Sequence, residues 1–223
     1  MESIEKQYQK FFLEYSERGP VTLGPLYSAV WRSDPKKLVI TLSRYKFVAK
    51  MLRNKSKVLE IGCAEGWAAS LVSGEVGELT LSDMDTIWEQ SISDVHQGKV
   101  KFKELDFVSK CADQKYDAIY ALDVLEHVLP INARTFCENL IKSLTEDGVA
   151  ILGMPSIESQ VYASEASKEG HVNCMSGEAF RELMNNYFKN VFLFSMNDEV
   201  VHTGFSQMAH YLIVLCVGPK VSQ

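Results

Sequence analysis

The 223-residue chain lacks the charge pattern of nucleic-acid-binding proteins. Its 23 Lys and Arg stand against 29 Asp and Glu, which gives a formal net charge of −6. A protein that follows a phosphate backbone needs a basic stripe, often with interleaved aromatic residues. Such a stripe does not occur in this sequence. The composition therefore predicts no nucleic-acid partner.

Cysteine pairs and long apolar runs are also missing. The five cysteines form no C-x-x-C pair, and their odd number fits neither a secreted disulfide framework nor a zinc cluster. No apolar run approaches the roughly 20 residues that cross a bilayer. The stretch 2–10 is charged and does not resemble a signal peptide. We therefore expect reduced thiols, no membrane span and a cytoplasmic protein.

The phosphate-binding loops of nucleotide enzymes are absent as well. A dinucleotide-binding turn has the spacing G-x-G-x-x-G, which lets backbone amides reach a pyrophosphate. Here Cys63 and Ala64 follow Gly62, and the next glycine is Gly66. No P-loop pattern with a Lys-Ser or Lys-Thr pair occurs either. The spacing disfavours hydride transfer with a nicotinamide cofactor.

What is present is a short apolar run that ends in a tight glycine turn. Residues 58–61 have the pattern of a buried strand, and 62–66 form the turn before a helix-compatible run at 67–72. A buried parallel strand passes to a helix in this way, and small residues let the backbone approach a ligand there. The stretch predicts a site for a nucleoside cofactor.

Three further strand patterns end in an acidic residue. They span 79–83, 100–105 and 116–121, and the acids at or just after their ends are Asp83, Asp106 and Asp123. Asp83 lies about 20 residues after the glycine turn, where nucleoside-binding α/β folds hold ribose hydroxyls with a carboxylate. We expect the strand ends to form one rim of a sheet.

Together these motifs resemble the class I S-adenosylmethionine-dependent methyltransferases. The resemblance extends from about residue 57 to the C-terminus, and the Leu-Glu-His-Val element at 125–128 narrows it to the small-molecule branch. It implies an α/β, Rossmann-like fold with a seven-stranded, mostly parallel sheet and one antiparallel edge strand. The last three strands are expected at 149–155, 191–194 and 211–217, with helices at 132–144 and from 176 onward.

The resemblance also implies S-adenosylmethionine as the cofactor. Glu60 would face the methionine amino end, and Asp83 would accept from the ribose hydroxyls. Asp106 and Phe107 would hold the adenine by a hydrogen bond and a ring contact. The full set of cofactor-binding residues expected from motif position is Glu60, Gly62, Cys63, Ala64, Gly66, Asp83, Met84, Asp106, Phe107, Leu122 and Asp123.

The N-terminal segment is expected to form a helical lid. Residues 1–54 precede the first strand, and residues 55–223 would form the cofactor-binding domain. In related enzymes such a segment covers the substrate mouth, so Tyr27, Trp31 and Tyr45 are candidate substrate contacts. The alternative is that these rings pack in the core of the lid, because aromatic side chains are mostly buried for packing.

Two histidines are the candidates for a catalytic role. Methyl transfer depends mainly on positioning, but an alcohol must lose its proton as it attacks. His127 follows the fourth strand, and His171 lies on the polar segment 156–173, which we expect to be a structureless wall of the active site. The alternatives are that His127 only shapes the pocket and that His171 only caps the loop.

Two acidic residues near His127 could also take part in the reaction or bind a metal. Asp123 and Glu126 could orient a histidine or the acceptor, although Glu126 could equally lie on a solvated helix face. We find no convincing ligand set in the sequence and expect no metal.

As the atom that receives the methyl group, the resemblance favours an oxygen, and less a nitrogen, of a sugar, sugar nucleotide or cell-envelope saccharide precursor. A quinone or aromatic-ring methyltransferase, or an inactive cofactor-binding module, is the alternative, and either a monomer or a homodimer is compatible with the sequence.

Overall fold

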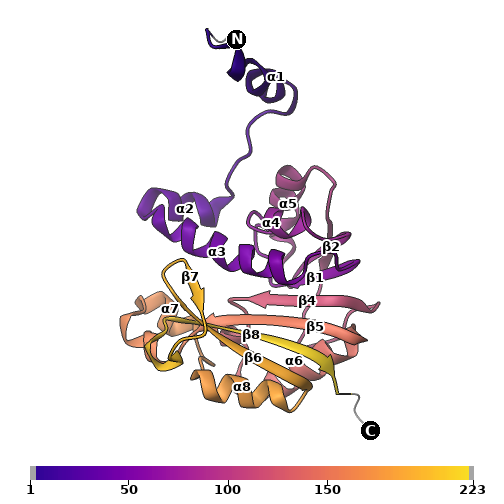
Figure 1. Ribbon diagram of the computed structural model, residues 1–223, viewed down its shortest axis with the longest axis vertical. Helices are drawn as coiled ribbons and strands as arrows, with labels where there is room; N and C mark the ends of the chain where they lie inside the picture. Colours follow the sequence, from indigo (N-terminus) through magenta and orange to yellow (C-terminus); the bar gives the residue numbers. More distant parts are fainter. Residues whose placement is uncertain (1–3, 221–223) are drawn as a thin grey trace.

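The computed structural model describes residues 4–220 of the chain. Its centre is a single sheet whose strands are β1 (Lys57–Ile61), β2 (Glu78–Asp83), β3 (Lys101–Glu104), β4 (Tyr116–Leu122), β5 (Leu144–Pro155), β6 (Phe188–Asn197), β7 (Val200–His202) and β8 (Tyr211–Pro219). The strand order is β3-β2-β1-β4-β5-β8-β6-β7 (Figure 1). The order reverses between β1 and β4, which is where open α/β sheets form a crevice at the carboxyl ends of their strands.

The sheet is mostly parallel, as the sequence predicts. Strands β3, β2, β1, β4 and β5 are parallel neighbours, whereas β8 runs antiparallel to both β5 and β6. The sheet has eight strands in the described part of the chain, not seven, because the turn-rich stretch before β8 forms the short antiparallel edge strand β7. The reversed strand β8 is also internal, between β5 and β6, and is not the edge member that we expected.

Helices cover both faces of the sheet (Figure 1). They are α1 (Gln9–Arg18), α2 (Pro25–Ser33), α3 (Lys36–Met51), α4 (Ser70–Ser73), α5 (Glu89–His96), α6 (Pro130–Ser143), α7 (Glu165–Gly170) and α8 (Gly177–Asn185), with 3-10 turns η1 (Lys6–Tyr8), η2 (Thr86–Trp88), η3 (Leu125–His127), η4 (Glu158–Tyr162) and η5 (Ser206–Met208). Among residues 4–220, no helix is both long and apolar enough to cross a bilayer.

The central strand β1 is buried on both faces, which explains its continuous apolar run. Leu59 belongs to a core cluster with Phe136 of α6 and Phe180 of α8. Val58, which points to the other face, belongs to a second cluster with Val48 of α3. The strand is therefore fixed between two layers of helices, and the turn that follows it is held in place.

The N-terminal segment divides into three different environments. Helix α3 packs into the core, where Val48 and Leu52 are fully buried. Helix α2 lies beside α3 and has no buried residue, and α1 extends away from the body of the molecule (Figure 1). Among the described residues of this segment, α1 and α2 thus contribute no buried residue to the core.

The polar segment 156–173 is not structureless, contrary to our expectation. It contains η4 and α7, and the Ser164 hydroxyl accepts a hydrogen bond from the Ser167 amide at the start of α7. Serine is a favourable N-cap because it satisfies an amide that the first helical turn leaves free. The ordered segment places His171 at a fixed position directly after α7.

Candidate active site

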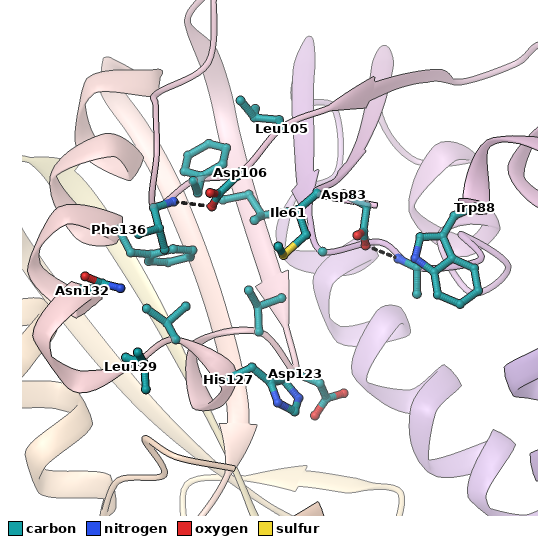
Figure 2. A pocket seen from close by; sticks show the side chains of 17 residues that line it. Ile61, Asp83, Trp88, Leu105, Asp106, Asp123, His127, Leu129, Asn132 and Phe136 are labelled. Atoms are coloured by element: carbon teal, nitrogen blue, oxygen red, sulfur yellow. Dashed lines mark hydrogen bonds between the residues drawn. The ribbon is translucent and has the colours of Figure 1, made fainter. Parts of the chain in front are cut away.

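A cavity of about 530 Å³ lies at the carboxyl ends of the parallel strands (Figure 2). Its volume falls in the range of small-molecule sites. Of the eleven predicted cofactor-binding residues, those that line it are Gly62, Ala64, Asp83, Met84, Asp106, Phe107 and Asp123. Side chains that the sequence did not single out complete the wall, including Trp88, Val108, Leu129, Asn132 and Phe136.

Asp83 ties two strand-end loops together at the cavity. Its Oδ2 accepts from the Ala64 amide at 2.9 Å, and its Oδ1 accepts from the Asp85 amide at 3.0 Å. The turn itself requires Gly62, which has a φ of +69° and where an added Cβ would meet Val124 Cγ2 at 2.4 Å. The two hydrogen bonds therefore fix the position of the Asp83 carboxylate at the edge of the cavity (Figure 2).

Asp106 is held in its ionised form at the end of β3. Its Oδ1 accepts from the Val108 amide at 2.8 Å, and its Oδ2 accepts from the Ser109 hydroxyl. These bonds, the Ser109 bond above all, lower the pKa of Asp106. The neighbouring Phe107 ring is buried and packs 6.0 Å from the Phe136 ring, so it forms the apolar floor beside the acid.

Four predicted cofactor residues lie behind the cavity wall: Glu60, Cys63, Gly66 and Leu122. Glu60 is buried between two phenols, because its carboxylate accepts from Tyr45 Oη and from Tyr120 Oη, each at 2.6 Å. Burial raises the pKa of Glu60 to about 7, against which the two hydrogen bonds act. Its carboxylate therefore links α3 to β4 and does not line the cavity.

The three predicted substrate contacts lie in different places. Tyr45 is buried as the partner of Glu60, which corresponds to the packing alternative. The Tyr27 ring packs against Trp67, with 5.2 Å between ring centroids. Trp31 is 59% exposed on α2. None of the three is among the residues that line the cavity.

Glu65, which sequence reasoning did not single out, fastens α2 to the glycine turn. It is fully buried, and its two carboxylate oxygens accept from the Leu26 and Tyr27 amides in the first turn of α2. A carboxylate there satisfies free amides and complements the positive end of the helix. The signal in the sequence was the acid itself, which stands in a turn whose other residues are small.

A second polar group lies beyond the end of β4. Asp123 has a φ of +57°, and its Oδ2 accepts from Arg44 Nη1 of α3 at 2.7 Å. The Arg44 guanidinium also lies 3.6 Å from the centroid of the Tyr211 ring. Arg44 was not predicted from the sequence. It joins α3, β4 and β8 next to the cavity.

Glu126 is fully buried next to this group. Neither of its carboxylate oxygens has a hydrogen-bond partner among the described residues. Burial raises the pKa of Glu126 well above its usual range, and the negative charge of Asp123 adds to this effect. Glu126 therefore does not lie on a solvated helix face.

The structure brings the two candidate histidines together. The His127 and His171 rings lie 5.1 Å apart between centroids. His127 Nδ1 is 2.9 Å from the Gly170 carbonyl oxygen, and His171 Nδ1 is 2.9 Å from Gln160 Oε1. His127 also lines the cavity (Figure 2). Burial and the nearby His127 lower the pKa of His171.

A family model described as "Methyltransferase domain" matches residues 32–190 of the chain. The chain belongs to this methyltransferase family. The predicted class I S-adenosylmethionine-dependent methyltransferase, with its cofactor and Rossmann-like fold, is thereby confirmed at the level of the family. The match includes the glycine turn and all four parallel strand ends that form the cavity. A comparison with curated proteins finds no match.

Solved structures of low sequence identity share the fold of this methyltransferase. The N-methyltransferase NodS from Bradyrhizobium japonicum WM9, in complex with S-adenosylhomocysteine, has a TM-score of 0.59 at 19% identity, over 85% of this chain and 92% of NodS. DhpI, also in complex with SAH, has a TM-score of 0.65 at 15% identity, over 87% and 92% of the two chains. The methyltransferase domain of bacterial CtHen1-C has a TM-score of 0.66 at 16% identity, over 81% and 100%.

The Glu65 contact predicts a local change in the mobility of this methyltransferase. In Glu65→Ala the amides of Leu26 and Tyr27 lose their acceptors, and we expect them to exchange hydrogen roughly ten-fold faster, which corresponds to the loss of a helix cap. Hydrogen exchange of α2 measures this. Glu199→Ala, an exposed carboxylate at the β6–β7 turn, is the control. Unchanged exchange in α2 of the Glu65 variant would contradict the assigned contact.

Proposed function

We propose that this methyltransferase transfers the methyl group of S-adenosylmethionine to an oxygen of a small polar acceptor, with sugars, sugar nucleotides and saccharide precursors as the leading class. The observation that carries the proposal is the polar mouth of the cavity. Asp123 and His127 line the cavity, and Arg44, Glu126 and His171 lie directly around them. Such a mouth suits a hydroxylated acceptor better than an isoprenoid quinone.

The cofactor is proposed to lie along the strand ends. Asp83 is placed to accept from the two ribose hydroxyls, and Asp106, ionised and beside Phe107, is placed to hold the adenine. The methionine part would then extend past Gly62 and Ala64 toward Asp123. The complexes of NodS and DhpI with S-adenosylhomocysteine, which share the fold, support the choice of cofactor.

In the reaction the acceptor oxygen attacks the methyl carbon opposite the sulfur. The new O–C bond forms as the C–S bond breaks, and the bonding pair returns to sulfur, which leaves the uncharged thioether of S-adenosylhomocysteine. The hydroxyl proton must leave as well. We assign the handling of this hydroxyl to His171 and His127, as base or as acceptor-orienting groups, because their Nδ1 atoms are already engaged and their Nε2 atoms are available.

The second candidate is a nitrogen acceptor, because NodS, which shares the fold, is an N-methyltransferase. A methyl-release assay separates the candidates when it is run on neutral sugars, sugar nucleotides, amino sugars and quinols. Turnover on a hydroxyl of a sugar is the expected result. Turnover on quinols alone would overturn the proposal, and cofactor binding without any turnover would favour an inactive module.

Replacing His171 with Ala is expected to lower kcat by roughly 100-fold or more while leaving the affinity for S-adenosylmethionine unchanged. A group that handles the acceptor proton contributes about this much to the rate, and His171 is not among the residues that line the cofactor cavity. Calorimetry and initial rates measure the two quantities. His202→Ala, a histidine of β7 that bonds to Asn197, is the control. Equal losses of kcat and cofactor affinity would show that the role is wrong.

A further inference from the structure

Three potential ligands converge beside the cofactor cavity. Glu126, His127 and His171 each offer one ligand atom, and these atoms all lie within 4.8 Å of one another. Two of the residues belong to η3 after β4, and the third follows α7, so the ordered segment after β5 closes the group. Two imidazoles and one carboxylate form a ligand set that divalent transition metals prefer.

Glu126 supplies an independent sign that a cation belongs here. Its side chain is fully buried, and both of its oxygens lack a hydrogen-bond partner within residues 4–220. A buried carboxylate with no partner is costly, and nearly all such groups in proteins are paired or coordinate a metal. Arg44, the nearby cation, already makes its ion pair with Asp123 at 2.7 Å. The Glu126 carboxyl group is therefore left without a direct partner among the described residues.

The hydrogen bonds of the two rings prepare their other nitrogens for coordination. The Gly170 carbonyl oxygen can only accept, so His127 Nδ1 carries the proton and donates over 2.9 Å. His171 Nδ1 faces Gln160 Oε1 in the same way, also at 2.9 Å. The lone pair of each neutral ring then lies on Nε2. Metal-binding histidines almost always donate their second nitrogen to a carbonyl or carboxylate in this manner.

We propose that Glu126, His127 and His171 bind a divalent transition-metal cation at the mouth of the cofactor cavity. Because His127 also lines the cavity, the cation would lie beside the acceptor. An ion bound there would act as a Lewis acid on an acceptor hydroxyl, and the two histidines would then orient the acceptor through the ion and would not themselves take its proton. This role rests on the proposed function, whereas the binding itself does not. The proposal departs from the expectation of no metal, because the sequence alone does not show that His171 lies next to Glu126.

The test is a titration of the full chain, stripped by a chelator, with Co²⁺ and with Zn²⁺. We expect one equivalent to bind, with a visible Co²⁺ absorption band, and each of Glu126→Gln, His127→Ala and His171→Ala to weaken binding by at least about 100-fold, since each removes a direct ligand. Glu126→Gln keeps the shape of the side chain. Circular dichroism and urea unfolding serve as the folding controls for every variant, because His127 lines the cofactor cavity and its replacement can change cofactor affinity directly. His202→Ala is the matched histidine control.

The outcomes separate this proposal from the proposed function. A wild-type chain that binds S-adenosylmethionine but neither Co²⁺ nor Zn²⁺ would overturn the metal site and leave methyl transfer standing. Equal metal binding by the wild type and His171→Ala would also overturn it. Metal binding that disappears in the three variants supports the site even if no acceptor is methylated, a result that would instead overturn the proposed function.

Discussion

Replacing Asp83 with Ala is expected to weaken the binding of S-adenosylmethionine by about 100-fold or more. A hydrogen bond to a charged group contributes about 1.5–3 kcal/mol, and two ribose hydroxyls would lose the same acceptor. Two such bonds correspond to a factor of at least about 100 in the dissociation constant. The Ala64 and Asp85 amides would also lose their acceptors, so the wall of the cavity loosens at the same time.

Calorimetry with S-adenosylmethionine and S-adenosylhomocysteine measures this loss. Asp113→Ala is the matched control, because Asp113 is a 71% exposed carboxylate at the surface that pairs with Lys103 outside the cavity. We expect the control to bind like the wild type. A folded Asp83 variant with wild-type affinity would mean that the ribose does not lie at the end of β2.

Replacing Glu60 with Gln is expected to stabilise the protein above pH 7 by up to about 3 kcal/mol. Burial raises the pKa of Glu60 from 4.5 to about 7. Between these values the folded state keeps its proton while the unfolded chain loses it, so the wild type becomes less stable as the pH rises through this window. At about 1.4 kcal/mol for each pH unit, the difference is fully present above pH 7. Gln stays neutral and can still bond to the Tyr45 and Tyr120 hydroxyls.

Urea unfolding between pH 4.5 and 8 tests this prediction. The wild type should lose stability across the window, and the Glu60→Gln variant should show a flatter profile. Glu182→Gln, an exposed carboxylate on α8, is the control and should follow the wild type. Parallel profiles for the wild type and the Glu60 variant would contradict the raised pKa.

The sheet could be predicted because its signals are local. A strand buried on both faces needs a continuous apolar run, and 58–61 has one. The grouping of the acids could be predicted too, because parallel strands have their carboxyl ends at one edge of the sheet. Asp83, Asp106 and Asp123 accordingly line one cavity. The short strand β7 was missed because three residues in a turn-rich stretch give no periodic pattern.

The contacts that complete the site depend on partners far apart in the chain. Glu65 caps a helix whose amides lie 38 and 39 residues earlier, and Arg44 pairs with Asp123 across 79 residues. Spacing along a sequence does not reveal such pairs. Helix α7 is different, because Ser164 is an N-cap signal that could have been recognised. Because α7 was not predicted, the proximity of His171 to His127 was not predicted either.

The most direct test of the account is a crystal structure of the full chain with S-adenosylhomocysteine. We expect the ligand in the cavity at the carboxyl ends of β1, β2 and β4, with its ribose hydroxyls on Asp83, its adenine beside Asp106 and its sulfur toward Asp123. A ligand bound elsewhere, or an empty cavity at a saturating ligand concentration, would contradict the account.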